Sequence, residues 1–170
     1  MKYSAKQLVV SAATAALYVL LSLLSSALGL AYGPVQLRLS EALCVLPFLI
    51  PGTAPGLVLG CVIANLLSPY GVVDLICGSF ATLLAALVTA KMKKAALAPL
   101  PPVLLNAVVV GGMLTWYERG FSAGFWPIFG ANALWIALGE AASCYILGML
   151  LLRIIPKTPL LRRFMKGDRI

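Results

Sequence analysis

Three acidic side chains stand nearly alone in long apolar stretches of the sequence. Glu41 follows an uncharged run that begins at Gln7, Asp74 follows a second such run, and Glu140 interrupts a third. An ionised carboxylate at the centre of a membrane costs at least ~2.5–3.5 kcal/mol, so such residues normally face the interior of a helix bundle or a cavity. These three carboxylates are therefore the first candidates for a binding site.

The composition predicts an all-α membrane protein. Hydrophobic residues make up 62% of the 170 residues and charged residues only 11%, and several uncharged stretches exceed the ~18 residues that indicate a membrane span. The net charge of +8 lies in short connections and at the two ends. The positions of these basic residues are therefore explained by the orientation of the chain in the membrane. Nucleic-acid binding would need a basic stripe with interleaved aromatic residues.

Breaks in hydrophobicity and clusters of Pro and Gly divide the chain into six expected transmembrane helices. They are expected at about residues 7–30, 38–51, 54–68, 71–92, 99–117 and 126–153, followed by a basic cytoplasmic tail over residues 154–170. The second and third are short, since about 14 residues span only ~21 Å. They either cross the membrane at a poor tilt or stop inside the protein. We expect the six helices to form one bundle and a single membrane domain, residues 1–170.

The distribution of Lys and Arg predicts that both termini are cytoplasmic, because cytoplasmic loops are enriched in these residues. With six crossings, only Arg38 and Arg119 fall on the outer side. The inner side then receives Lys2, Lys6, Lys91, Lys93, Lys94, Arg153, Lys157, Arg162, Arg163, Lys166 and Arg169.

The last expected helix carries one polar stripe. Six residues occupy roughly one side at 100° per residue, namely Asn132, Trp135, Ile136, Gly139, Glu140 and Ser143. Hydrogen bonds between helices explain Ser143 well and Asn132 in part, but they explain Glu140 poorly. Glu140 is therefore the strongest candidate for ligand contact. Trp135 lies ~13 Å deeper along the helix than Trp126 and either stacks on a planar ligand or packs against lipid.

Other polar and aromatic residues predict an outward-open pocket. The candidates outside the last helix are Arg38, Glu41, Asn65, Asp74, Asn106 and Trp116. Arg38 and Glu41 have the i, i+3 spacing that permits an ion pair along one helix. Asn65 and Asp74 lie near the same mouth, and a helix cap explains either of them equally well.

Enzyme activity, a metal and a cofactor are not expected. The chain has no histidine, which is the commonest metal ligand and acid–base group. A Ser–His or Cys–His hydrolase is therefore excluded, and a zinc site is disfavoured. The four cysteines lie singly inside expected helices and are interpreted as small hydrophobic residues.

Small residues at four-residue spacing predict close helix packing. Gly56 and Gly60 form such a face on the third expected helix, and Ala12 and Ala16 form one on the first. In lipid such faces let helix backbones approach closely. Since Ala12 and Ala16 lie near the cytoplasmic end, contact with a separate membrane subunit is the alternative for this pair.

Several segments together resemble a known family. They are residues 35–43 (VQLRLSEAL), 46–48 (LPF), 55–57 (PGL), 60–61 (GC), 63–66 (IANL), 97–104 (LAPLPPVL), Asn106, 139–140 (GE) and 144–145 (CY). With six short helices and a small-residue face on the first, they are similar to the substrate-binding S component of an energy-coupling factor (ECF) transporter. The branch they resemble is the queuosine-precursor, QueT-type branch, and the likeness runs to about Leu152.

The resemblance implies a 7-deazaguanine ligand such as preQ0, preQ1 or queuine. The guanine-like edge presents two N–H donors that one carboxylate accepts side by side. Glu41 and Glu140 are the candidates for this clamp, and the other carboxylate is free to meet the ammonium of preQ1. The residues expected to read the carbonyl and the ring nitrogens are Asn65, Asn106 and Asn132.

The resemblance also implies partners and a location. A transmembrane T subunit and two ATPase subunits would drive uptake across a prokaryotic plasma membrane, and Ala12 and Ala16 would contact the T subunit. Two alternatives remain at this point: a small stand-alone carrier, and an S component for another small heterocyclic vitamin. The sequence shows no internal repeat of useful length, which disfavours an autonomous alternating-access carrier.

Overall fold

The computed structural model describes residues 5–32 and 36–165, and every regular element in these ranges is helical. The all-α class expected from the composition is therefore confirmed for this part of the chain. Four residues used above lie outside the described residues: Lys2, Val35, Lys166 and Arg169.

Four helical stretches of the described chain are long and apolar enough to cross a membrane. They are α1 (Ala5–Ala27), α3 (Val72–Thr89), the stretch Ala95–Arg119 formed by η3 (Ala95–Leu97) and α4 (Leu100–Arg119), and the stretch Phe125–Lys157. Large apolar side chains cover their outer faces, for example Val9 on α1, Ile76 on α3 and Val108 on α4. Such an apolar surface is suited to contact with lipid tails, and α-helices satisfy their own backbone hydrogen bonds there.

The two short expected helices take a different form. The segment is built from η1 (Leu39–Phe48), η2 (Pro51–Thr53) and α2 (Ala54–Asn65). η1 is a 3₁₀ helix with Pro47 inside it, and Pro51 begins η2; proline cannot donate the backbone hydrogen bond of an α-helix. All residues from 40 to 50 are buried. The two alternatives for this segment were a poorly tilted crossing of the membrane and an end inside the protein, and η1 follows the second.

The stretch Phe125–Lys157 changes helix type in its middle. It runs through α5 (Phe125–Ala141), the π-helix η4 (Ala142–Gly148), α6 (Met149–Ile154) and η5 (Ile155–Lys157), and α7 (Pro159–Arg162) follows. Two glycines let the segment around η1 pack directly on this helix. A Cβ atom added to Gly139 would lie 2.1 Å from the carbonyl oxygen of Gln36, and one added to Gly148 would lie 2.9 Å from Val45.

The small-residue face of α2 packs against α1, as the spacing predicts. A Cβ atom added to Gly56 would lie 2.0 Å from the carbonyl oxygen of Ser11, and one added to Gly60 would lie 2.8 Å from Cβ of Tyr18. On α1 itself, Ala12 and Ala16 are exposed. That pair therefore lies at the outer surface of the described chain.

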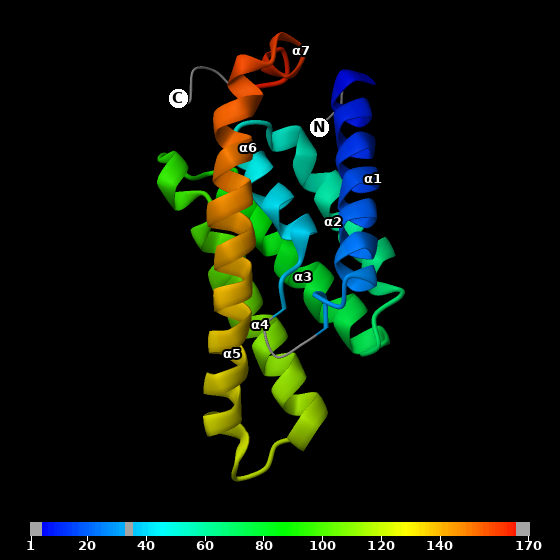
Figure 1. Cartoon of the computed structure of the whole chain (residues 1–170), viewed down its shortest axis with the longest axis vertical. Coiled ribbons are helices and arrows are strands. Elements are labelled where there is room, and N and C mark those ends of the chain that lie inside the picture. Colours follow the sequence, from blue (N-terminus) through cyan, green and yellow to red (C-terminus); the bar gives the residue numbers. More distant parts are fainter. Residues whose placement is uncertain (1–4, 33–35, 166–170) are drawn as a thin grey trace.

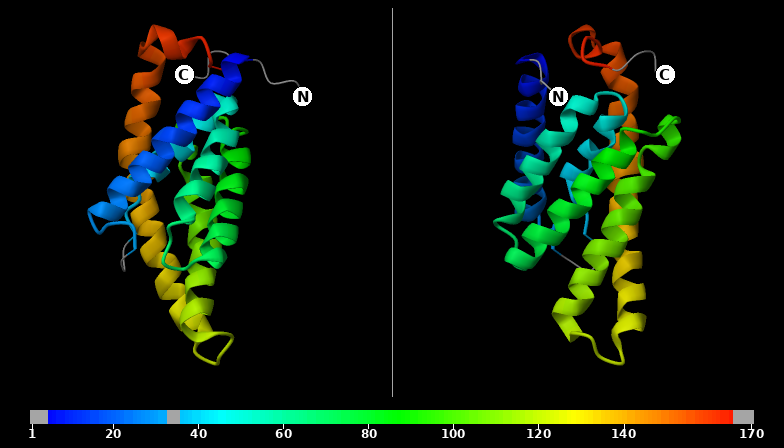
Figure 2. Two further views of the ribbon diagram at one scale, coloured as in Figure 1. Left: turned by 90° about the vertical axis from the view of Figure 1, so that its right-hand side faces the viewer. Right: turned by 180° about the vertical axis from the view of Figure 1, so that it is seen from behind.

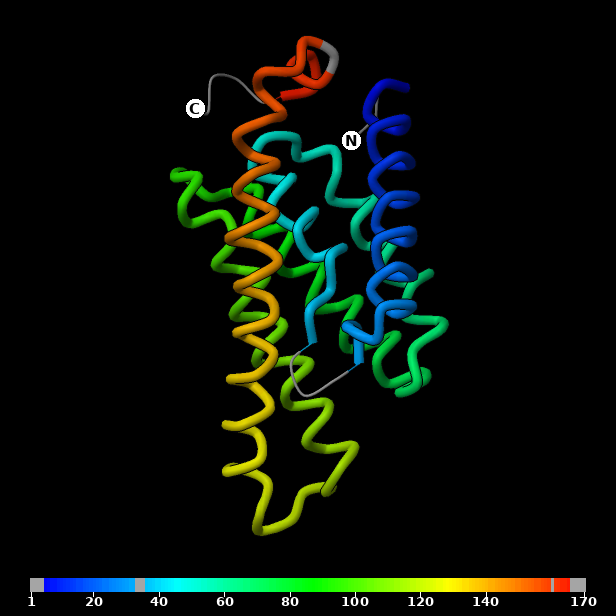
Figure 3. Tube along the Cα trace, in the orientation of Figure 1, coloured from blue at the N-terminus to red at the C-terminus, as the bar shows by residue number. Residues whose placement is uncertain are grey.

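The helices form an elongated bundle with unequal ends. The start of α1 and the segment around α7 lie at the same end, and the connection between α3 and α4 lies toward it (Figures 1 and 2). The α4–α5 hairpin extends beyond the other helices at the opposite end, where Trp116 and Trp126 are exposed. η1 runs through the interior, between α1 and the helix that contains η4 (Figure 3).

Candidate functional site

Glu41 and Glu140 meet in the interior of the bundle through Asn106. The side-chain nitrogen Nδ2 of Asn106, on α4, donates to Oε1 of Glu140 at 2.9 Å and lies 3.5 Å from Oε2 of Glu41. Glu41 is 2% exposed and Glu140 6%. Three separate elements, η1, α4 and α5, thus bring two carboxylates and one amide to a single buried point.

Donors from α1, η1 and η4 surround this pair. The hydroxyl of Tyr18 donates to Oε1 of Glu41, and the thiol of Cys44 donates to Oε2 of Glu41 at 3.0 Å. The thiol of Cys144 lies 3.2 Å from the backbone oxygen of Glu41 and 3.9 Å from Oε2 of Glu140. These donors offset part of the cost of burying two carboxylates.

The interpretation of Cys44 and Cys144 as plain small hydrophobic residues is therefore incomplete. Cys44 follows Glu41 by three positions and Cys144 follows Glu140 by four, which places each thiol on the helix face of its carboxylate. That spacing is a signal the sequence does contain. Tyr18 carries no comparable signal, because it lies between apolar residues and its partner is on another element.

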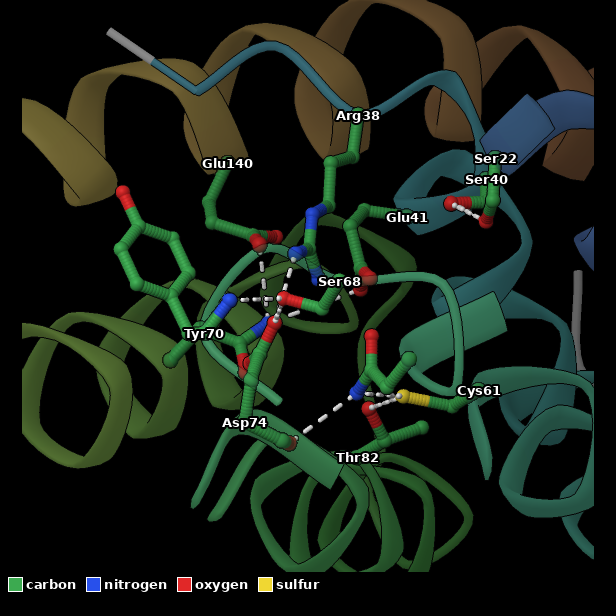
Figure 4. A network of polar contacts seen from close by, with 12 residues as sticks. Ser22, Arg38, Ser40, Glu41, Cys61, Ser68, Tyr70, Asp74, Thr82 and Glu140 are labelled. Carbon is green, nitrogen blue, oxygen red and sulfur yellow. Dashed lines mark hydrogen bonds and ion pairs between the residues drawn. The ribbon is translucent and has the colours of Figure 1, made fainter. Parts of the chain in front are cut away.

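Arg38 pairs with Asp74, not with Glu41. Nη2 of Arg38 lies 3.3 Å from Oδ2 of Asp74, and the hydroxyl of Ser68 donates to the same oxygen at 2.6 Å. Figure 4 shows the side chains of Arg38, Glu41 and Glu140 converging in the interior. The carboxylate of Asp74 is fully buried, while α3 has Gly71 at its N-cap position without a side-chain cap bond. The cap interpretation of Asp74 is thus not supported.

Tyrosines cover the arginine on the side of the α4–α5 hairpin. The guanidinium carbon of Arg38 lies 5.4 Å from the ring centre of Tyr32, within the range of a cation–π contact. Tyr32 contacts Tyr70 edge to face, and Tyr70 contacts Tyr117 in the same way. Burial and the nearby Asp74 carboxylate raise the pKa of Tyr70 above its ordinary value, so this phenol stays neutral at physiological pH.

Asn65 joins α2 to α3 beside the ion pair. Its Nδ2 donates to the backbone oxygen of Asp74 at 3.2 Å and lies 3.4 Å from the sulfur of Cys61. Gly78 makes room for this contact, since an added Cβ atom would lie 2.7 Å from that nitrogen. Asn65 is therefore next to Asp74, as expected, through contacts between helices.

The buried cluster consists of Glu41, Glu140, Asn106, Arg38 and Asp74 with their hydrogen-bond partners. Three other candidates lie outside it. Asn132 donates to the hydroxyl of Thr115 at 3.1 Å and so links α5 to α4. Trp135 is 44% exposed and Trp116 43%, so both indoles lie at the outer surface of the chain. The expected stripe on the last helix is divided accordingly: Glu140 and Ser143 are buried, whereas Trp135 is not.

The cluster is rich in hydrogen-bond acceptors. It contains the carboxylates of Glu41, Glu140 and Asp74 but only one guanidinium, that of Arg38, and Oδ1 of Asp74 has no hydrogen-bond partner among the described residues. No group of three metal-ligating side chains occurs in the part of the chain that the structure describes. Chemically, such a site suits a small ligand with several N–H donors.

Comparison with known proteins identifies the family. A family model described as QueT transporter matches residues 8–157, a range that includes every side chain of the cluster. No curated protein and no solved structure matches the chain. With its long apolar helices, the chain is a multi-pass membrane protein, and it belongs to the QueT transporter family.

Proposed function

We propose that this protein is the substrate-binding S component of an ECF transporter. In this role it captures a 7-deazaguanine from outside the cell, and a T subunit with two ATPase subunits drives uptake. The observation that carries the proposal is the buried pair of Glu41 and Glu140 on the Asn106 amide. Family membership supports a transporter, and the chemistry of the pair supports the ligand class.

The ligand edge and the carboxylate pair are chemically complementary. The guanine-like edge of preQ0, preQ1 or queuine carries an N1–H and an exocyclic amine, and one carboxylate accepts both side by side. A second carboxylate suits the ammonium of preQ1. In a membrane interior, where water does not compete, each such charge-assisted hydrogen bond is stronger than in water.

We assign the base edge to Glu140. Glu41 already accepts hydrogen bonds from Tyr18 and Cys44 and lies near Asn106. Glu140 accepts from Asn106 and has only a long contact with Cys144. Since an ionised carboxylate has about four acceptor sites, Glu140 keeps more of them free for a ligand. Glu41 then holds the site in shape and supplies the second charge.

Among the amides, Asn106 is the best candidate to read the ligand carbonyl or ring nitrogens. Its side chain already lies between the two carboxylates. Asn65 and Asn132 make hydrogen bonds between helices, so we assign them a supporting role. Arg38 and Asp74 form the rim of the site, and Trp116 and Trp135 contact the ligand only if the helices rearrange around it.

The exposed face of Ala12 and Ala16 is proposed to contact the T subunit. Both residues are exposed on α1 while Ala15 beside them is buried. Small side chains permit a second helix to approach closely. The proposed orientation puts both termini in the cytoplasm of a prokaryotic cell, so this face lies toward the cytoplasmic end, where an energised partner acts.

Reconstitution tests this function. Purified protein is incorporated into liposomes, and uptake of radiolabelled preQ1 is measured with and without an ECF module and ATP. We expect binding by the protein alone but accumulation only with the module and ATP. Accumulation by the protein alone would identify a stand-alone carrier. Binding of another heterocycle in preference to every deazaguanine would identify an S component for a different vitamin.

A further inference from the structure

A cavity at the end of the bundle where α1 begins and α7 lies has no role in the proposed function. Its volume is about 480 Å³. Three segments line it: the start of α1 (Lys6, Gln7, Val10), the junction of η1 and η2 (Ile50, Pro51, Gly52) and the residues after α7 (Arg163, Phe164, Met165). A second cavity of about 290 Å³ adjoins it, since Arg163 lines both.

The lining of the cavity divides into a cationic and an apolar part. Lys6 and Arg163 come from opposite ends of the sequence, and the remaining wall includes Val10, Ile50 and Phe164. The adjoining cavity adds two more basic side chains, Lys157 and Arg162, beside the shared Arg163.

No acidic residue neutralises these cations within the described chain. None of the described residues that line either cavity is acidic. Glu41, Asp74 and Glu140 are buried in the interior, and Glu118 lies in the last turn of α4 at the opposite end. The one ion pair in the described ranges joins Arg38 to Asp74. The cavity is therefore complementary to an anion.

The position of the cavity identifies the kind of anion. Directly after Lys6, α1 exposes Leu8 and Val9 by 58% and 67%, so the boundary between lipid tails and headgroups passes through this turn. A ligand at this boundary meets cations on one side and apolar surface on the other. Basic residues next to a membrane span attract anionic lipids.

We propose that this cavity binds the phosphodiester headgroup of an anionic phospholipid. Lys6 and Arg163 contact the phosphate, and an acyl chain lies along Val10 and Phe164. The bound lipid then joins the first helix of the protein to its last segment. This inference is independent of the deazaguanine site, because no residue of the cavity belongs to the carboxylate cluster.

Native mass spectrometry of the whole protein tests the proposal. The probes are dioleoyl phosphatidylglycerol, dioleoyl phosphatidylcholine with the same acyl chains, and soluble glycerol phosphate. We expect one phosphatidylglycerol to be retained per protein, at least about tenfold more tightly than phosphatidylcholine, with no displacement by glycerol phosphate. The double variant Lys6→Gln/Arg163→Gln is expected to lose about tenfold or more of this affinity.

The matched control is Lys93→Gln/Lys94→Gln, which removes two exposed cations outside both cavities. It is expected to retain phosphatidylglycerol within about twofold of the unmodified protein. Equal retention of both lipids, or an equal loss in the control, would overturn the proposal. Displacement by glycerol phosphate would overturn it in favour of a soluble phosphate ligand. If the double variant does not fold, the comparison of the two lipids on the unmodified protein decides alone.

Discussion

Glu41 and Glu140 approach the same nitrogen atom, Nδ2 of Asn106, at 3.5 and 2.9 Å. Two carboxyl groups held this close in a membrane interior lose their hydration, and they repel each other whenever both are ionised. Tyr18 and Cys44 offset part of this cost with hydrogen bonds to the carboxylate of Glu41. The remaining acceptor capacity of the pair is what a donor-rich ligand would fill.

The Tyr18–Glu41 hydrogen bond predicts a stability effect. Tyr18→Phe removes the donor hydroxyl and leaves the buried carboxylate with one partner fewer, at a cost of about 1–3 kcal/mol of unfolding free energy. Thermal unfolding in detergent is expected to show a lower midpoint. Tyr145→Phe is the control, since Tyr145 is 40% exposed. Equal midpoints for the two variants would show that the hydroxyl of Tyr18 contributes nothing.

The Arg38–Asp74 pair predicts non-additive losses. Asp74→Asn leaves a buried guanidinium without its counter-ion, and breaking one side of a buried pair costs up to about 3–5 kcal/mol. Because the Arg38 side chain is 12% exposed, we expect a loss at or below the lower end of this range. The double variant Arg38→Gln/Asp74→Asn is expected to be more stable than Asp74→Asn. Additive losses in this cycle would contradict the pairing.

The apolar pattern of the sequence predicts the membrane class and the buried carboxylates, because both follow from the cost of charge in lipid. For this reason the interior location of Glu41 and Glu140 could be predicted from the sequence. The partner of Arg38 could not be predicted, because the i, i+3 spacing favours Glu41, whereas Asp74 lies on another helix. Pairing between elements depends on packing, which helical periodicity does not encode.

The 3₁₀ conformation of η1 also could not be predicted from the hydrophobic periodicity. Residues 38–51 are expected to form a short helix, but they contain a ten-residue 3₁₀ helix that includes Pro47 and is buried from Ser40 to Phe48. Its fit against the last helix depends on Gly139 and Gly148, whose close contacts are with backbone and side chains distant in the sequence. Trp135 and Glu140 are five positions apart on α5, or about 140° around the helix, so Glu140 faces inward while Trp135 is exposed.

Glycine contacts predict opposite effects for two identical substitutions. Gly56→Ala would put a Cβ atom 2.0 Å from the carbonyl oxygen of Ser11, whereas Gly130→Ala meets nothing within 4 Å. We expect Gly56→Ala to destabilise the protein by about 1–3 kcal/mol through overpacking. Gly130→Ala is expected to be neutral or stabilising by up to about 1 kcal/mol. Thermal unfolding of both variants measures this, and a stable Gly56→Ala variant would refute the close α1–α2 contact.

The proposed partner surface predicts a separation of binding from transport. Ala12→Trp adds a large side chain to the exposed face of α1, so ligand binding by the protein alone is expected to be unchanged. Uptake with the ECF module is expected to be lost. Val108→Trp is the control, because Val108 is 59% exposed on α4. Normal uptake by Ala12→Trp would exclude this face as the partner surface.

The most direct test of the binding site is a calorimetric titration of purified protein with preQ1, preQ0 and queuine. We expect one ligand per protein for at least one of them. Glu140→Gln should weaken that binding by at least about tenfold, or ~1.4 kcal/mol, while the variant still folds. Glu118→Gln removes the same charge from an exposed position and should bind normally. Unchanged affinity in Glu140→Gln, or no binding of any deazaguanine, would contradict the account.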